Sequence, residues 1–206
     1  MRHRVTSSYH NGAKDPKARE KMHYASTMAG MAFANGFLGI CHSMAHQLGA
    51  MFHVPHGLAN ALMICHVIRY NATDAPFKQA TFSQYKYPNA KWRYSRIADY
   101  LNLGGETEME KVDRLILAIE DLKQQVGIPH AIKDVIKESE AEFLAKIDEL
   151  ADRAFDDQCT GANPRDPLIK DLTQLYIDAY YGHPLVEAQQ NGKIVIPEEP
   201  QVVATT

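Results

Sequence analysis

The sequence has few cysteines, little net charge and no long apolar run. Its three cysteines, Cys41, Cys65 and Cys159, are odd in number, widely spaced and not arranged as Cys-x2-Cys. This argues against a disulfide framework or a thiolate zinc site and favours a reducing cytoplasm. The formal net charge of −3 gives no basic field for nucleic-acid phosphates. Without a signal-peptide pattern or an apolar run near the ~18 residues of a membrane span, we expect a cytoplasmic protein that binds neither nucleic acid nor a membrane.

Strand-like alternation of apolar and polar residues is also missing, which predicts an all-α fold. The 206 residues, 45% of them hydrophobic, are enough for one substantial core. Apolar residues recur at helical spacing, and the first of these stretches has a spacing that suits buried helices. The expected helices cover about residues 15–52 with a bend at Gly36 and Gly39, then 56–71, 90–102, 106–126, 130–136, 140–154 and 167–181.

The remaining segments are expected to be irregular. Residues 73–88 are aromatic and polar with two prolines, and residues 156–164 combine clustered Asp with Gly and Asn-Pro, which disfavours helix and strand. From Gly182 the chain is rich in Pro, Gln and Glu without periodicity. We therefore predict one helical domain at residues 1–181 and a disordered tail at residues 182–206.

Histidines gather in one short segment, CHSMAHQLGAMFHVPHGLANALMICH, which contains five of the ten in the chain. His42 and His46 are four residues apart and would share a helix face, while His56 follows a proline that can turn the next helix back toward them. Neutral imidazole is a good ligand for zinc, iron and copper. Spacing alone therefore suggests a metal site. The segment contains no Asp or Glu, but three nitrogens suffice for zinc.

Two further interpretations of these histidines stand beside that one. A single histidine on an apolar face is usually part of the core, and this is the better expectation for His53 and His66. The other interpretation is an autonomous zinc metallohydrolase that uses His42, His46 and His56. It requires all three imidazoles to reach one ion at about 2.0–2.1 Å.

The histidine segment also resembles a known signature. The run from Ala32 to Ala72, with His-x3-His followed by His-Gly-x2-Asn-Ala, is similar to the signature of iron-containing alcohol dehydrogenases. The likeness continues through FDDQCTGANPR and covers about residues 8–181. Both segments resemble in particular the alcohol dehydrogenase domain of bifunctional aldehyde–alcohol dehydrogenases. The resemblance implies the helical, bundle-like C-terminal domain of the iron-dependent alcohol dehydrogenase (dehydroquinate synthase-like) fold.

Roles for individual residues follow from the resemblance alone. The family holds its metal with one Asp and three His, and His42 and His56 match the last two of these ligands. His46 matches a histidine that lies beside the nicotinamide and the substrate, where it helps to move the hydroxyl proton. Phe33 and Cys159 match positions that line the substrate pocket. The implied cofactors are Fe(II), with Zn(II) as the alternative, and NAD(H), for interconversion of acetaldehyde and ethanol.

Parts of that enzyme are missing from the sequence. No Asp-x3-His precedes His42, and no glycine-rich strand–turn–helix segment for a pyrophosphate is present. We therefore expect a fragment, inactive alone, that needs its nucleotide-binding half and that forms homo-oligomers or filaments within the complete protein. The start of the chain, with family-like sequence only from Ser8, favours truncation. The alternative from another class is a non-catalytic helical assembly module, since surface exposed by the missing domain favours association.

Overall fold

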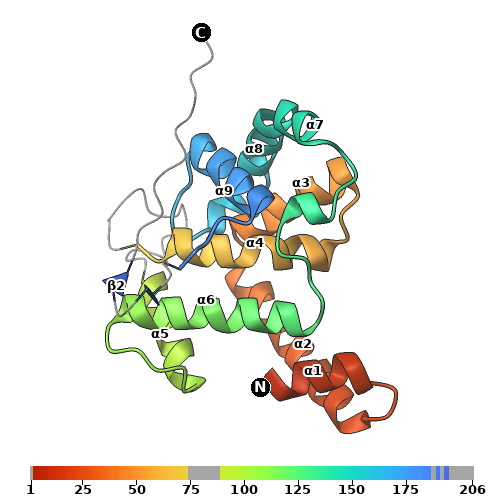
Figure 1. Ribbon diagram of the computed structural model, residues 1–206, viewed down its shortest axis with the longest axis vertical. Coiled ribbons are helices and arrows are strands. Elements are labelled where there is room, and N and C mark those ends of the chain that lie inside the picture. Colours follow the sequence, from red (N-terminus) through yellow and green to blue (C-terminus); the bar gives the residue numbers. More distant parts are fainter. Residues whose placement is uncertain (1, 74–88, 187–188, 191–192, 195–206) are drawn as a thin grey trace.

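The computed structural model describes residues 2–73, 89–186, 189–190 and 193–194, and this part of the chain is helical, as predicted (Figure 1). Strand structure among the described residues is limited to the antiparallel pair of β1 (Gln189–Gln190) and β2 (Lys193–Ile194). No described helix is both long and apolar enough to cross a lipid bilayer. The α-helices are α1 (Arg2–Asn11), α2 (Pro16–Gly36), α3 (Ile40–Phe52), α4 (His56–Asn71), α5 (Ala90–Tyr100), α6 (Glu108–Gln125), α7 (Glu140–Ala145), α8 (Ile147–Asp156) and α9 (Ile169–Tyr181).

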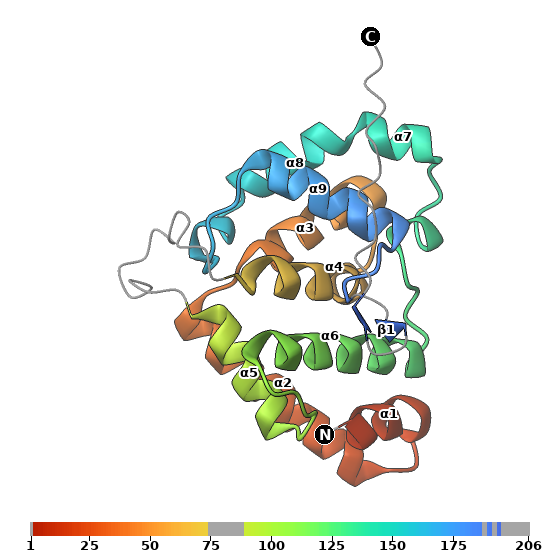
Figure 2. The ribbon, with the colours of Figure 1, turned by 60° about the vertical axis from the view of Figure 1, so that its left-hand side comes forward.

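Helix α4 lies between two hydrophobic clusters. One of its sides packs with α3, α7, α8 and α9 around fully buried side chains such as Met44, Leu62 and Tyr176. Its other side packs with α6 through a smaller cluster that includes Ile68 and Ile116. Figure 2 shows the resulting order, with α8 and α9 on one side of α4 and α6 on the other. The expected core is therefore present, and α3 and α4, which carry the histidines, are held at its centre.

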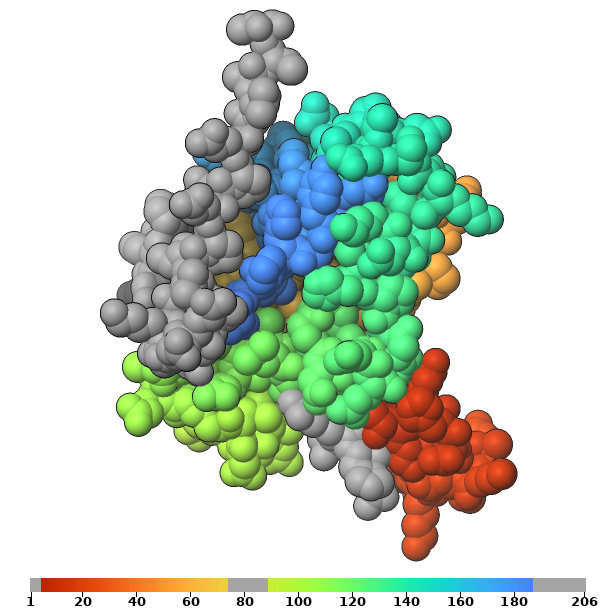
Figure 3. Space-filling model, viewed as in Figure 1, coloured from red at the N-terminus to blue at the C-terminus, as the bar shows by residue number. Residues whose placement is uncertain are grey.

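Helix α2 differs from its predicted environment. Its apolar residues suggested a buried helix, but Met28 and Met31 are 68% and 65% exposed, and Ala18 is its one buried residue. Helix α2 packs on α1, and the N-terminal segment, drawn in red, projects from one end of the molecule (Figure 3). The prediction of burial is wrong for this chain because no described segment forms a layer over the apolar face of α2.

Several element boundaries also differ from the predictions. The expected helix at 130–136 is a single 3-10 turn, Ile132–Asp134, closed by the Asp134 carboxylate on the Ala131 amide at 3.2 Å. The expected helix at 140–154 divides into α7 and α8 because the Lys146 amide bonds the Phe143 carbonyl, three residues back. Helix α1 was not expected. All but the first residue of the predicted loop at 73–88, and most of the predicted tail, lie outside the described residues.

Candidate metal centre

Three histidines meet where α3 and α4 approach each other. His42 and His46 are one turn apart on α3, and His56 is the first residue of α4, after Pro55. The ring centroids of His42 and His56 are 5.4 Å apart, those of His46 and His56 are 5.5 Å apart, and those of His42 and His46 are 6.1 Å apart. The turn between the two helices therefore gathers the histidines that the sequence singled out.

The start of α3 is fixed by a buried amide from far along the chain. Asn163 Oδ1 accepts a hydrogen bond from the Ile40 amide at 3.3 Å. The N-cap residue, Gly39, has no side chain that could accept this bond itself. A Cβ on Gly39 would come within 2.7 Å of that oxygen, so the glycine allows the close approach. Asn163 and Asn71 also bond each other through both amide groups, at 2.8 and 3.2 Å. The loop after α8 thereby sets where α3 begins.

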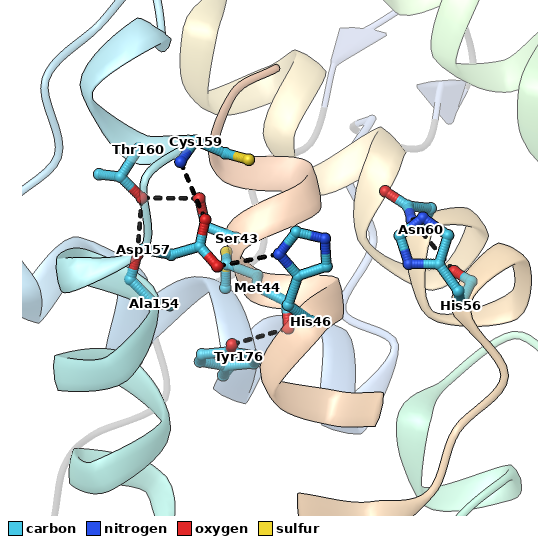
Figure 4. A network of polar contacts seen from close by, with 10 residues as sticks. All are labelled: Ser43, Met44, His46, His56, Asn60, Ala154, Asp157, Cys159, Thr160 and Tyr176. Carbon is cyan, nitrogen blue, oxygen red and sulfur yellow. Dashed lines mark hydrogen bonds and ion pairs between the residues drawn. The ribbon is translucent and has the colours of Figure 1, made fainter. Parts of the chain in front are cut away.

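His46 has a carboxylate partner. Its Nδ1 lies 2.9 Å from Oδ2 of Asp157, at the end of α8, and Oδ1 of Asp157 accepts the Cys159 amide at 2.9 Å (Figure 4). Desolvation would raise the pKa of Asp157, but the hydrogen bonds from Cys159 and His46 outweigh it and the pKa lies below its usual value. Asp157 is therefore ionised at neutral pH and faces the imidazole as an acceptor.

His56 has an amide neighbour on its own helix. The Asn60 Nδ2 lies 3.2 Å from His56 Nε2 and also donates to the His56 carbonyl at 3.0 Å. The Cys41 thiol donates to Asn60 Oδ1 at 3.5 Å. This chain of contacts orients the His56 ring from the side of α3, and binding of an ion through Nε2 would replace the contact with Asn60.

The donor set at His42 and His56 fits a borderline metal ion. Two imidazoles that bind one tetrahedral ion at about 2.0–2.1 Å have ring centroids about 5 Å apart, close to the observed 5.4 Å. Burial, followed by the charges of His56 and His46, lowers the pKa of His42. His42 is therefore neutral at physiological pH, which is the form that binds a metal.

The three-histidine zinc site is not supported by the same geometry. Among the described residues, one group of three potential metal ligands has its ligand atoms within 4.8 Å of one another. This group is His46, Asp157 and Cys159. Thus the nitrogens of His42, His46 and His56 do not converge on one point, and His46 Nδ1 is engaged by Asp157. In the group that does converge, burial and then Asp157 raise the pKa of Cys159 to about 11, so its thiol is protonated at neutral pH.

The other predicted residues lie in different environments. Cys159 is buried beside Asp157, whereas Phe33 on α2 is 48% exposed. His53 is exposed and ends α3 in a left-handed conformation, with φ of 57°. His66 is buried, and its Nδ1 has no hydrogen-bond partner among the described residues. The expectation of core or surface roles for His53 and His66 agrees with these positions.

A cavity of about 810 Å³ has His42 in its wall. Its walls are mainly apolar and come from the end of α2 and from α3, α4, α5 and α6, with Arg93 and Lys123 among the few charged lining residues. Phe33 and Cys159 are not part of this lining. The two residues expected to line the substrate pocket therefore do not line this cavity.

Three contributors to the site were not predicted as such: Asn60, Asn163 and Asp157. Asn60 stands four residues after His56, a spacing that places both on one face of α4. Asn163 and Asp157 lie in the segment FDDQCTGANPR, which was interpreted as a loop around Cys159. The many hydrogen-bonding residues in this segment indicated a structural role. The residues that they bond lie more than 110 positions earlier in the chain, and only the fold brings them together.

The fold and the histidine cluster define a helical chain with a candidate metal-binding cluster at the α3–α4 turn, and comparison with known proteins identifies its family. Residues 3–180 match the model of the Fe-containing alcohol dehydrogenase family, C-terminal. The chain is 55% identical to the bifunctional aldehyde-alcohol dehydrogenase of Escherichia coli (strain K12) over 92% of its length, and 41% identical to the NADPH-dependent butanol dehydrogenase of Clostridium saccharobutylicum over 82%. The chain belongs to the Fe-containing alcohol dehydrogenase family.

Solved structures agree with this assignment. A crystal structure of 1,3-propanediol oxidoreductase and the alcohol dehydrogenase from Oenococcus oeni each superpose with a TM-score of 0.72 at 30% identity. Each comparison covers 87% of this chain and 42% of the other chain. The chain spans 21% of the length of the Escherichia coli relative and 39% of the butanol dehydrogenase. It therefore corresponds to the C-terminal part of longer enzymes.

Proposed function

We propose that this chain forms the metal-binding half of an alcohol dehydrogenase that interconverts ethanol and acetaldehyde with NAD(H). In this proposal residues 1–181 act as one helical domain, His42 and His56 are two of the metal ligands, and His46 handles the substrate proton. Fe(II) is the proposed ion and Zn(II) the alternative, since nitrogen ligands accept both. The isolated chain is inactive because two further ligands and the nucleotide site come from another polypeptide segment.

The observation that carries the proposal is the pairing of His42 and His56 across the α3–α4 turn. Their separation suits a shared ion, and the lowered pKa of His42 keeps a lone pair available. His56 is exposed and His42 half-buried, so a second polypeptide segment can reach the ion from the open side. Asn163 bonds both the Ile40 amide at the start of α3 and the Asn71 side chain at the end of α4, and so holds the two helices in this relation.

The chemistry divides between the ion and the protein. A bound divalent ion would act as a Lewis acid toward the alcohol or aldehyde oxygen. His46 lies beside His56, and its side chain is 35% exposed. In this proposal it accepts the hydroxyl proton during oxidation and returns it during reduction. Phe33 and Cys159 would complete the substrate pocket once the other half covers α2. No covalent step is assigned to Cys159, whose thiol is protonated and buried.

The proposed partner is the nucleotide-binding half itself, and α2 offers it a surface. Tyr24, Met28 and Met31 are spaced four and three residues apart, and each is more than half exposed. They form an apolar stripe on α2 of the kind that a helix usually buries against a neighbouring segment. Homo-oligomers or filaments would then belong to the assembled enzyme. A reducing cytoplasm is the proposed location, since Cys41, Cys65 and Cys159 are all unpaired.

Anaerobic calorimetric titration of the purified chain with Fe(II) or Zn(II) tests the ligand assignment. We expect one weak binding event that His42→Ala or His56→Ala abolishes, because one remaining imidazole cannot hold the ion. His23→Ala, which removes an exposed histidine of α2, is the matched control and should bind as the unmodified chain does. Equal binding by the His42 and His56 variants would contradict the proposal.

A further inference from the structure

The hydrogen bond between His46 and Asp157 occupies one side of the proposed proton acceptor. Asp157 is the C-cap residue of α8, its side chain is 13% exposed, and the Nδ1 to Oδ2 distance is 2.9 Å. The opposite edge of the ring, which carries Nε2, faces the side on which His56 and Asn60 lie (Figure 4). The two nitrogens of His46 therefore have different surroundings, one internal and one at the candidate centre.

Hydrogen bonds to the carboxylate and around it hold the Asp157 turn against α3. The second carboxylate oxygen accepts the Cys159 amide at 2.9 Å. The hydroxyl of Thr160, in the next turn, is hydrogen-bonded to the Ala154 carbonyl at 2.6 Å and to the Ser43 hydroxyl at 2.7 Å. Because Ser43 and His46 belong to the same helix, these bonds fix the Asp157 turn directly against α3. The Tyr176 hydroxyl adds a 2.9 Å bond to the Met44 carbonyl.

An ionised carboxylate can accept a hydrogen bond but cannot donate one. Opposite Asp157, neutral His46 must therefore carry its proton on Nδ1, which leaves the lone pair on Nε2. Only that tautomer can accept a substrate proton on the side of His42 and His56. A carboxylate in this position also stabilises the imidazolium that forms once the proton has been transferred.

We propose that Asp157 is a positioning residue that holds His46 in the Nδ1–H tautomer, with Nε2 directed toward the metal centre. The role in proton transfer rests on the proposed function: as the alcohol O–H bond breaks, its proton would pass to His46 Nε2, and the hydride from the adjacent C–H bond would be taken up by the nicotinamide held by the other half. The tautomer itself is a property of this chain and does not depend on the other half.

Asp157→Asn separates this role from a structural one. The asparagine Oδ1 can still accept the Cys159 amide, so the turn keeps its hydrogen bond. The group that faces His46 becomes an amide donor, which requires Nδ1 to be the acceptor and moves the proton to Nε2. Asp156→Asn is the matched control, because Asp156 is the adjacent residue, is exposed and makes the same change of charge.

The test is 15N NMR of the histidine rings in the full 206-residue chain without metal, at about pH 8.5, some two units above the ordinary imidazole pKa. His46→Gln assigns the signals. We expect Nδ1–H in the unmodified chain and in Asp156→Asn, and Nε2–H in Asp157→Asn. If that variant does not fold, Asp157→Ala, which removes the acceptor, should reduce the Nδ1–H population. An Nε2–H signal in the unmodified chain, or a tautomer unaffected by these changes, would overturn the proposal.

Activity of the chain combined with the nucleotide-binding half provides a second readout. General acid–base catalysis is worth about 10²–10⁴-fold, so Asp157→Asn should lower kcat by at least about 10²-fold with little change in KM. Asp156→Asn should leave both unchanged, and Asp157→Glu should restore part of the rate. A KM effect alone would show that Asp157 only shapes the pocket. If no combination is active but the tautomers are as expected, the proposed function fails and the positioning role of Asp157 stands.

Discussion

Replacing Asn163 by alanine tests how α3, and with it the histidine pair, is held. The change removes four hydrogen bonds, two accepted from Ile40 and Asn71 and two donated to Asn71 and Arg165. Ile40 and Asn71 are buried, so the Ile40 amide and the Asn71 side chain lose partners away from water. An unsatisfied buried group costs roughly 1–3 kcal/mol, and water entering the vacated space would recover part of this. We expect a loss of about 3 kcal/mol.

Urea unfolding followed by circular dichroism measures this loss. With a typical urea slope of about 2 kcal/mol per molar, the midpoint should fall by roughly 1.5 M while the slope stays the same. Asn35→Ala is the control, since among the described residues its exposed amide bonds the Met31 carbonyl of its own helix and nothing in the core. It should change stability by less than about 0.5 kcal/mol. Equal, small effects of the two variants would refute the role given to Asn163.

Two further predictions concern buried polar groups. Burial lowers the pKa of His66 to about 4. Between about pH 6.5 and 4 the unfolded chain therefore binds a proton that the folded chain does not. As the pH falls through this range, the free energy of unfolding should decrease by roughly 3 kcal/mol, at 1.36 kcal/mol per pH unit. His66→Leu should remove that loss from the pH profile of unfolding and His23→Leu should not; identical profiles would contradict the account. Tyr176→Phe removes the buried hydrogen bond to Met44 and should cost about 1 kcal/mol by urea unfolding, whereas an unchanged midpoint would show that this bond does not contribute.

Helix positions were predictable from the sequence because they follow local spacing and local breakers. Gly36 and Gly39 predicted the break between α2 and α3, and Pro55 predicted the start of α4 close to where each is found. The single turn at Ile132–Asp134 was not predictable in the same way, since six or seven residues of helical pattern are too few to propagate a helix. The exposure of α2 depends on which other segments are present, and helical spacing alone does not contain that information.

The candidate site shows the same division. His42, His46 and His56 lie close together because their separations along the chain are short and the intervening turn is specified locally. Asp157 reaches His46 across 111 residues, and Asn163 reaches Ile40 across 123. Neither contact produces a periodic pattern or a short motif. Their roles became apparent only when the packing of α8 and α9 against α3 placed the segment after α8 beside the histidines.

The central claim is that this chain supplies two metal ligands to an alcohol dehydrogenase and cannot act alone. Acetaldehyde-dependent NADH oxidation, measured anaerobically with added Fe(II), tests it on the chain alone and on the chain mixed with a matching nucleotide-binding half. We expect activity only in the mixture, and its loss with His56→Ala. Activity of the chain alone, or activity of the mixture that survives His56→Ala, would contradict the account.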